Sequence, residues 1–295
     1  MKIVVAGGTG FIGEPLVRRL IARGNNDVAV LTRNPAKVRS GRAVPWSGVA
    51  GEVAGAEVVI NLAGENVGAG RWTAERKRKI VDSRVGSTRE LVEAMRGNPR
   101  QRRTFISPSA VGYYGPRGDE LLDESAAPGE GFLADVVRQW EEAARGAEKI
   151  ARVALLRFGV VLAGEGGALQ KMMLPFRLGV GGPIGSGRQW MSWVDREDVL
   201  RAIEWAIDRP EVRGVYNITA PNPVMNRDFA RALGRALRRP AVLPTPAFAL
   251  RLIFGQMADE VLLSGQRVAP VRATIEGFVF EYPTIDAALR HVRER

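Results

Sequence analysis

The chain opens with an apolar run, KIVVA, that leads into GGTGFIG and then into a segment with helical periodicity, EPLVRRLIARG. Three glycines of this motif, Gly7, Gly10 and Gly13, therefore stand between an expected strand and an expected helix. In that context the first glycine permits a tight turn, the second lets the backbone approach a pyrophosphate, and the third lets helix and strand pack closely. The motif predicts a dinucleotide site with the phosphates at a helix N-terminus. Its other expected contacts are Thr9, Phe11 and Ile12.

The second expected strand ends with LTRN, and this ending bears on the choice of cofactor. A site that prefers NAD places Asp or Glu here, to accept hydrogen bonds from the ribose hydroxyls. This chain instead has Thr32, Arg33 and Asn34, which offer a cation and donors to a 2′-phosphate. The sequence therefore favours NADP, with Thr32 and Arg33 as contacts.

Strands and helices alternate along the first half of the chain. Further expected strands are DVAVLTRN, AVPW, AEVVINLAG, RRTFISPSA and ARVALLRFGVVL. Such alternation predicts an α/β fold, a Rossmann-type doubly wound parallel sheet. After Gly164 the segments are rich in glycine, and towards the end short helices are interrupted by proline. We expect a Rossmann domain of residues 1–163 and 195–220, and a smaller, mostly helical substrate lobe of residues 164–194 and 221–295.

Composition narrows the chemistry. The chain has no cysteine and one histidine, His291, so disulfides, thiolate metal sites and cysteine nucleophiles are excluded. A Ser-His-Asp triad or a multi-histidine metal site is not expected either, and we assign no metal. The chemistry must use hydroxyls, carboxylates, Lys or Arg, or a cofactor.

The net charge is +11, and RWTAERKRK and RGNPRQRR are dense in cations. These runs lie on expected helical surface and in a loop before a strand, without interleaved aromatic residues, so we do not expect nucleic-acid binding. No segment approaches the roughly 20 apolar residues of a membrane span, and the start does not read as a signal peptide. We expect a cytoplasmic protein with a small-molecule substrate, as a monomer or a homodimer.

Several segments together resemble a known family. They are INLAGENV, SAVGYYG, LRFGVVL, LPFRLGVGGPIGSG and GQRVAPVRATIEGF. In them the chain resembles an extended short-chain dehydrogenase/reductase, of the branch related to sugar-nucleotide epimerases and dehydratases. More narrowly, it resembles the atypical "epimerase family protein" group, which carries a C-terminal domain of unknown function. The resemblance covers essentially the whole chain and implies a nucleotide-sugar or carbonyl compound as substrate.

The resemblance also implies roles for particular residues. Arg84 would reach the phosphates, and Ser109 would take the catalytic serine position. Ser107 is the second choice for that position and otherwise a neighbour of the cofactor. The remaining cofactor contacts implied are Leu62, Ala63, Gly64, Lys79, Phe158 and Val160.

One feature of the family is missing. The helix GFLADVVRQWEEA should carry a Tyr and, four residues later, a Lys, yet no Tyr-x-x-x-Lys occurs anywhere in the chain. One hypothesis is an oxidoreductase in which Ser109 works with Tyr113 or Tyr114, with a tyrosine pKa near its usual value of about 10. The other is a protein that binds NADPH as a regulatory or interaction module, in which the tyrosines only pack. The sequence leaves open whether the chain is an enzyme.

Other residues are candidates for substrate contact. Two follow the fourth strand and three lie where the second lobe of related enzymes closes over the substrate: Glu65, Asn66, Arg188, Trp190 and Trp193. Each has an ordinary alternative, since polar residues are common in such loops and tryptophans are common in interfaces. We interpret Asp123 and Glu124 as part of a solvated loop.

Overall fold

A computed structural model describes residues 1–97 and 103–294. Its centre is a seven-stranded sheet in which every pairing is parallel, in the order β11-β7-β5-β4-β1-β2-β3. The strands are β1 (Lys2–Ala6), β2 (Asp27–Thr32), β3 (Arg42–Pro45), β4 (Val58–Asn61), β5 (Thr104–Ala110), β7 (Arg152–Phe158) and β11 (Gly214–Ile218). This confirms the α/β Rossmann-type fold. Much of the cation-dense run RGNPRQRR falls outside the described residues.

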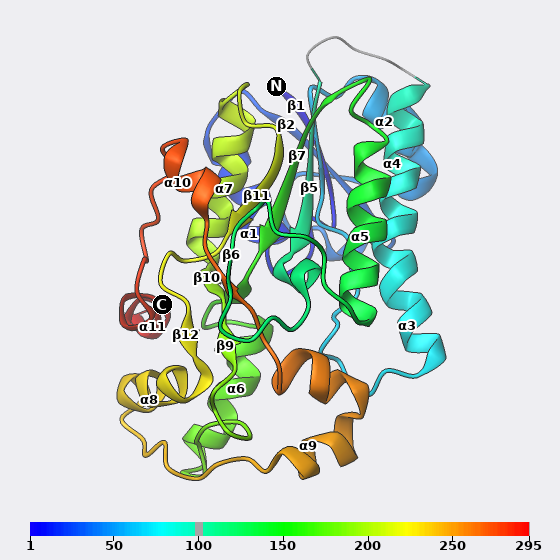
Figure 1. The fold of residues 1–295 in the computed structure, drawn as a ribbon. Coiled ribbons are helices and arrows are strands. Elements are labelled where there is room, and N and C mark those ends of the chain that lie inside the picture. The colour runs from blue at the N-terminus through cyan, green and yellow to red at the C-terminus, as the bar shows by residue number, and fades with distance from the viewer. Residues whose placement is uncertain (98–102, 295) are drawn as a thin grey trace.

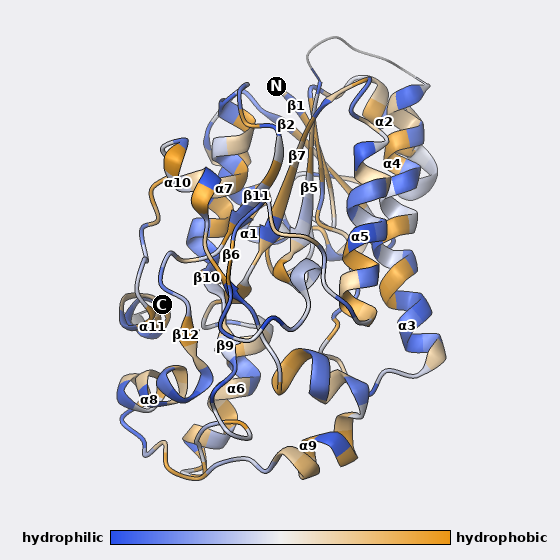
Figure 2. Ribbon diagram, in the orientation of Figure 1, coloured by the Kyte–Doolittle hydropathy of each residue, from blue (hydrophilic) through white to orange (hydrophobic). Residues whose placement is uncertain are grey.

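Helices cover both faces of the sheet (Figure 1). The strands are apolar on both faces, as expected for strands that are covered on both sides. The helices therefore pack against the sheet in two hydrophobic cores, one on each face. One face carries α1 (Gly13–Ala22) and α7 (Arg196–Asp208), and the other carries α2 (Val49–Ala54), α4 (Ser87–Arg96) and α5 (Phe132–Arg145). Figure 2 shows the resulting pattern of apolar strands between helices whose outer faces are hydrophilic.

Helix α5 is the helix in which the family's Tyr and Lys were expected. Val136 and Trp140 of α5 are buried, and Phe132 packs edge-on against Trp72 with ring centroids 5.0 Å apart. The apolar spacing of this helix therefore directs one face inward.

The long helical segment before β5 is not continuous. It consists of α3 (Ala74–Val81), the π-helical turn η3 (Asp82–Gly86) and α4. A π-helical turn widens the backbone locally and is frequent at functional sites. Short 3₁₀ turns are η1 (Pro35–Lys37), η2 (Trp46–Gly48) and η4 (Val111–Tyr114).

The remaining elements gather beyond the carboxyl ends of the strands and beside α7 (Figure 1). The helical ones are α6 (Gly167–Arg177), α8 (Asn226–Leu237), α9 (Ala247–Phe254), η5 (Ala258–Leu262), α10 (Val271–Ile275) and α11 (Ile285–Glu294). Three short strand pairs join them: β8 (Val160–Leu162) with β10 (Trp193–Asp195), β9 (Trp190–Met191) with β12 (Val224–Met225), and β6 (Leu121–Leu122) with β13 (Arg267–Val268). Among the described residues, no helix combines the length and apolar character that crossing a bilayer requires.

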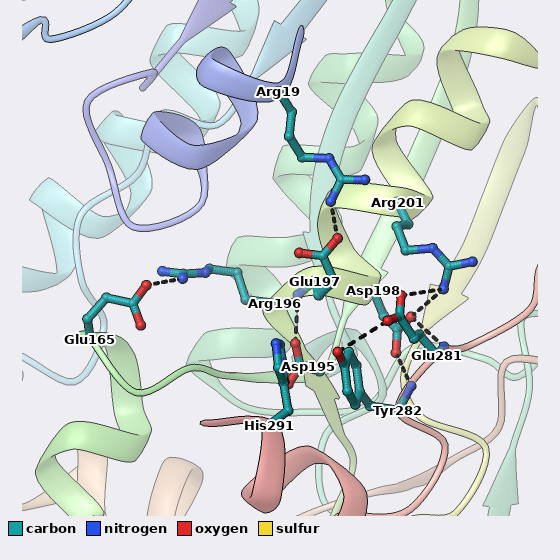
Figure 3. Close-up of polar contacts among 10 residues, drawn as sticks. All are labelled: Arg19, Glu165, Asp195, Arg196, Glu197, Asp198, Arg201, Glu281, Tyr282 and His291. Carbon is teal, nitrogen blue, oxygen red and sulfur yellow. Dashed lines mark hydrogen bonds and ion pairs between the residues drawn. The ribbon is translucent and has the colours of Figure 1, made fainter. Parts of the chain in front are cut away.

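Polar contacts join α1 and α11 to the α7 region (Figure 3). Arg19 of α1 pairs with Glu197 and, at 2.7 Å, with Glu204 of α7. His291 of α11 places Nδ1 3.0 Å from Oδ2 of the buried Asp195, which is the N-cap of α7. The His291 ring stacks on Tyr282 with ring centroids 4.1 Å apart. The contact between His291 and Asp195 thus joins the C-terminal helix α11 to the start of α7, the helix that covers one face of the sheet.

The surroundings of Glu124 differ from those expected for a residue of a solvated loop. Glu124 is half-buried rather than solvated, because its carboxylate accepts hydrogen bonds from the backbone N–H groups of Asn217 and Arg272. Burial raises the pKa of Glu124 above its ordinary value. The interpretation of Glu124 was wrong, because segments distant in the sequence supply its partners.

Candidate functional site

The glycine turn has the geometry that the motif requires. Gly7 has φ of 76°, and a Cβ there would lie 2.5 Å from the backbone of Leu62. A Cβ on Gly13 would lie 2.2 Å from the carbonyl oxygen of Gly7, so both glycines are needed for the fold itself. A Cβ on Gly10 would have only that oxygen within 4 Å, at 3.2 Å. The space beside Gly10 is open, which is what a pyrophosphate needs.

The rest of the turn surrounds this space. Thr9 and Gly10 are exposed, while Phe11 and Ile12 are half-buried. No side chain caps the start of α1. The Phe11 ring contacts the glycines at 166 and 167, and the Arg196 guanidinium lies 5.1 Å from its centroid. The turn therefore combines an exposed backbone edge with one anchored aromatic side chain.

Two strand ends adjoin the turn. Thr32 is buried, and its hydroxyl accepts a hydrogen bond of 3.0 Å from Asn34 N–H, which turns the chain after β2. Arg33 leaves that turn with 84% of its side chain exposed. Leu62, Ala63 and Gly64 follow β4 directly.

Four charged side chains meet where β2, β4 and the α3–η3 segment approach one another. The Glu65 carboxylate lies 3.6 Å from the Arg33 guanidinium and 3.3 Å from that of Arg76. Arg84 donates to the backbone oxygens of Glu65, at 2.9 Å, and Ile80, at 3.2 Å. Burial lowers the pKa of Arg84 to about 10. The structure thus brings Arg33 and Arg84, expected as cofactor contacts, together with Glu65, expected as a substrate contact.

Lys79 lies elsewhere. It pairs with Glu75 at 2.6 Å on an exposed part of α3, and no described contact joins it to the four charged side chains. Ser107 lies within β5, Phe158 ends β7 and Val160 begins β8. Ser107 and Phe158 are buried, and Val160 is half-buried.

A buried polar network lies beneath the carboxyl ends of β5 and β7. Ser109 donates a 2.5 Å hydrogen bond to Glu141 of α5, and Arg157 donates to both oxygens of that carboxylate at 2.7 and 2.9 Å. Arg157 also donates to the Tyr114 hydroxyl at 2.9 Å, which in turn donates to Asn217 at 2.8 Å. All five residues are buried. The serine hydroxyl is therefore committed to a carboxylate inside the protein.

The two adjacent tyrosines differ in their surroundings. Burial raises the pKa of Tyr114 to about 12, so the expectation of a value near 10 is wrong for this residue. Tyr113 is half-buried, its ring lies 3.5 Å from the Arg157 guanidinium carbon, and no described residue bonds its hydroxyl. Of the two hydroxyls, that of Tyr113 is the one left for an incoming group.

The candidate substrate residues do not share one surrounding. Asn66 accepts from Gly68 N–H at 2.9 Å, Arg188 is exposed, and the Trp190 indole donates to Asp119 at 2.6 Å. Trp193 is fully buried in the core of the α6–α8 region and donates to Asn222 O at 3.2 Å. The assignment of Trp193 to substrate contact is therefore corrected: the side chain packs in the core.

Sequence reasoning missed four residues that these contacts identify, namely Arg76, Glu141, Arg157 and Asn217. One signal was available, because Arg157 interrupts the apolar run ARVALLRFGVVL, and a charge inside a buried strand requires a buried partner. The identity of that partner depends on how α5 packs against the sheet.

Comparisons with known proteins identify the family of this chain. A model of the NAD dependent epimerase/dehydratase family matches residues 3–219, and a domain of unknown function, DUF1731, matches residues 245–292. The chain belongs to the NAD dependent epimerase/dehydratase family, which confirms the resemblance.

Individual relatives extend over the whole chain. The Arabidopsis thaliana protein "Epimerase family protein SDR39U1 homolog, chloroplastic" is 41% identical over 305 residues, covering 100% of this chain and 87% of its own length. An epimerase family protein of Mycobacterium bovis is 40% identical over 299 residues, covering 99% of this chain and 98% of its own. The crystal structure of human epimerase family protein SDR39U1 (isoform 2) with NADPH has a TM-score of 0.91 at 36% identity, with 100% of both chains covered.

Proposed function

We propose that this protein binds NADPH at the glycine turn. The observations that carry the proposal are the open space at Gly10 and the cluster of three arginines and one glutamate that follows the ends of β2 and β4. The backbone there fits a pyrophosphate, and the arginines supply the positive charge that the phosphates require. The relative crystallised with NADPH supports the same assignment.

Each part of the site would hold a different part of the cofactor. The backbone of the glycine turn would hold the pyrophosphate, and Arg84 would add charge beside it. Arg33 would pair with the 2′-phosphate, and Leu62 and Ala63 would line the adenosine side. When bound, NADPH would supply a hydride from its nicotinamide ring.

The chemistry best supported is oxidoreduction of a nucleotide-sugar or carbonyl substrate, with Tyr113 as the proton-transfer group. Ser109 and Tyr114 are both engaged in buried hydrogen bonds, whereas the Tyr113 hydroxyl has no described partner. Arg157 lies against the Tyr113 ring, so the guanidinium fixes the position of that ring beside the buried network. Tyr113 would therefore take the part that the absent tyrosine of α5 plays in related enzymes.

The same network supports the second candidate function, an NADPH-binding regulatory or interaction module. Two of the three proposed catalytic hydroxyls stabilise the fold, and the helix without Tyr and Lys packs as a structural element. We also propose a cytoplasmic location, a monomer or homodimer, and a smaller lobe of residues 164–194 and 221–295 that holds the substrate.

Two experiments test these proposals. Calorimetric titration should show NADPH binding tighter than NADH by about 1.5 to 3 kcal/mol, and Arg33→Ala should remove most of this difference. Equal affinities in the unmutated protein would contradict the cofactor assignment.

A screen of carbonyl and nucleotide-sugar compounds for NADPH oxidation should find a substrate whose turnover is lost in Tyr113→Phe and largely kept in Ser109→Ala. Binding without any turnover would favour the module.

A further inference from the structure

Glu65 holds two arginines from different parts of the chain. Its Oε1 lies 3.6 Å from Nη2 of Arg33, which follows β2, and its Oε2 lies 3.3 Å from Nη1 of Arg76 on α3. Arg76 also donates to the backbone oxygen of Asn66. One carboxylate thus bridges the end of β2 and the start of α3.

The backbone of Glu65 is held independently of its side chain. Its N–H donates to the Ser83 hydroxyl at 2.9 Å, and its carbonyl oxygen accepts from Arg84 at 2.9 Å. A change of the Glu65 side chain therefore leaves these two contacts in place. This makes the carboxylate a clean target for substitution.

The charges around Glu65 do not balance. Three guanidinium groups, on Arg33, Arg76 and Arg84, surround one carboxylate, so the cluster carries two positive charges in excess. Burial lowers the pKa of Arg84 to about 10; the charge of Arg76 lowers this pKa further, and that of Glu65 raises it. The cluster attracts a polyanion, and its most exposed cation is Arg33, with 84% of its side chain exposed.

We propose that Glu65 is a competing counter-ion that limits the selectivity of this site for NADPH over NADH. The inference rests on the proposed binding of NADPH. A 2′-phosphate carries about two negative charges and three acceptor oxygens, so it is a stronger partner for Arg33 than a carboxylate at 3.6 Å. Arg33 is free to turn towards the phosphate, and Glu65 keeps Arg76 as its partner. Glu65 is thus a positioning residue that weakens NADPH binding through Arg33.

The test is a binding cycle with Glu65→Gln and Arg33→Ala. NADPH and NADH affinities are measured by calorimetry for the unmutated protein, each single variant and the double variant. Glu65→Gln should tighten NADPH about two- to fivefold, the size of one exposed ion pair, and should change NADH much less. In the Arg33→Ala background, Glu65→Gln should have no selective effect on NADPH.

A matched control removes a carboxylate that does not compete with the 2′-phosphate for Arg33. Glu75→Gln takes away the charge of an exposed glutamate on the same helix that carries Arg76, where it pairs with Lys79. It should leave the NADPH to NADH ratio unchanged. Circular dichroism of each variant establishes that the fold is kept, and Glu65→Ala serves as a second variant if Glu65→Gln unfolds.

The outcomes separate this inference from the proposed function. If the unmutated protein binds neither cofactor, the proposed function fails. If it binds NADPH and Glu65→Gln tightens both cofactors equally, the glutamate acts only through its long-range charge and the inference is wrong. A selective effect that persists without Arg33 would overturn it as well.

Discussion

The Ser109 hydroxyl donates a 2.5 Å hydrogen bond to the buried carboxylate of Glu141. The same carboxylate receives two hydrogen bonds from Arg157, whose side chain is also buried. A serine expected to transfer protons is therefore part of an internal ion-pair network between α5 and β7.

Loss of one partner of this ion pair should cost stability. Glu141→Leu leaves the Arg157 charge buried without its carboxylate, and we expect the free energy of unfolding to fall by about 3 to 5 kcal/mol. Urea denaturation measures the change. The double variant Glu141→Leu with Arg157→Met should recover much of the loss, because it removes both charges. A double variant as unstable as the single one would contradict this account.

The Tyr114 hydroxyl should lose its proton at a higher pH than an ordinary tyrosine does. Burial raises its pKa to about 12, and Tyr216 has a pKa raised to about 12 by burial and by its bond to Glu276. Because the folded pKa exceeds the unfolded value of about 10, the associated stability is present below pH 10 and is lost as the pH rises through 12. Absorbance at 295 nm after a rapid pH jump measures the number of tyrosinates at each final pH. Tyr114→Phe should remove one tyrosinate from the part of this titration near pH 12. Loss of a tyrosinate that forms near pH 10 would contradict the raised pKa of Tyr114.

Gly10 and Gly13 should respond differently to added side chains. Gly10→Val should abolish NADPH binding and leave the circular dichroism spectrum largely unchanged, because its side chain enters the proposed pyrophosphate space. Gly13→Val should destabilise the fold, because its Cβ would lie 2.2 Å from the Gly7 oxygen. Calorimetry and thermal unfolding measure the two effects. A folded Gly10→Val that binds NADPH normally would place the phosphate site elsewhere.

The single histidine should anchor the C-terminal helix. His291→Ala removes the contact with the buried Asp195 and the stacking on Tyr282, and we expect a loss of about 1 to 3 kcal/mol. Thermal unfolding measures it. Arg290→Ala, an exposed neighbour on α11, is the control and should have little effect. Equal losses in the two variants would argue against the anchoring role.

The sequence alone determined the fold class and the glycine turn between β1 and α1 of this protein. Both depend on local patterns: apolar runs that alternate with helical periodicity, and glycines at fixed positions between a strand and a helix. The inward face of α5, with Val136 and Trp140, followed from the same kind of spacing. Such patterns are readable because backbone geometry and burial act over a few residues.

Only the tertiary structure decided which polar groups meet. Ser109 and Glu141 are 32 residues apart, and Tyr114 and Asn217 are 103 apart, so no local pattern could pair them. Trp193 likewise reads as a candidate contact until packing buries it. A hydroxyl or carboxylate has the same chemistry in any sequence context, and its availability depends on which neighbours the folded chain brings within hydrogen-bond distance.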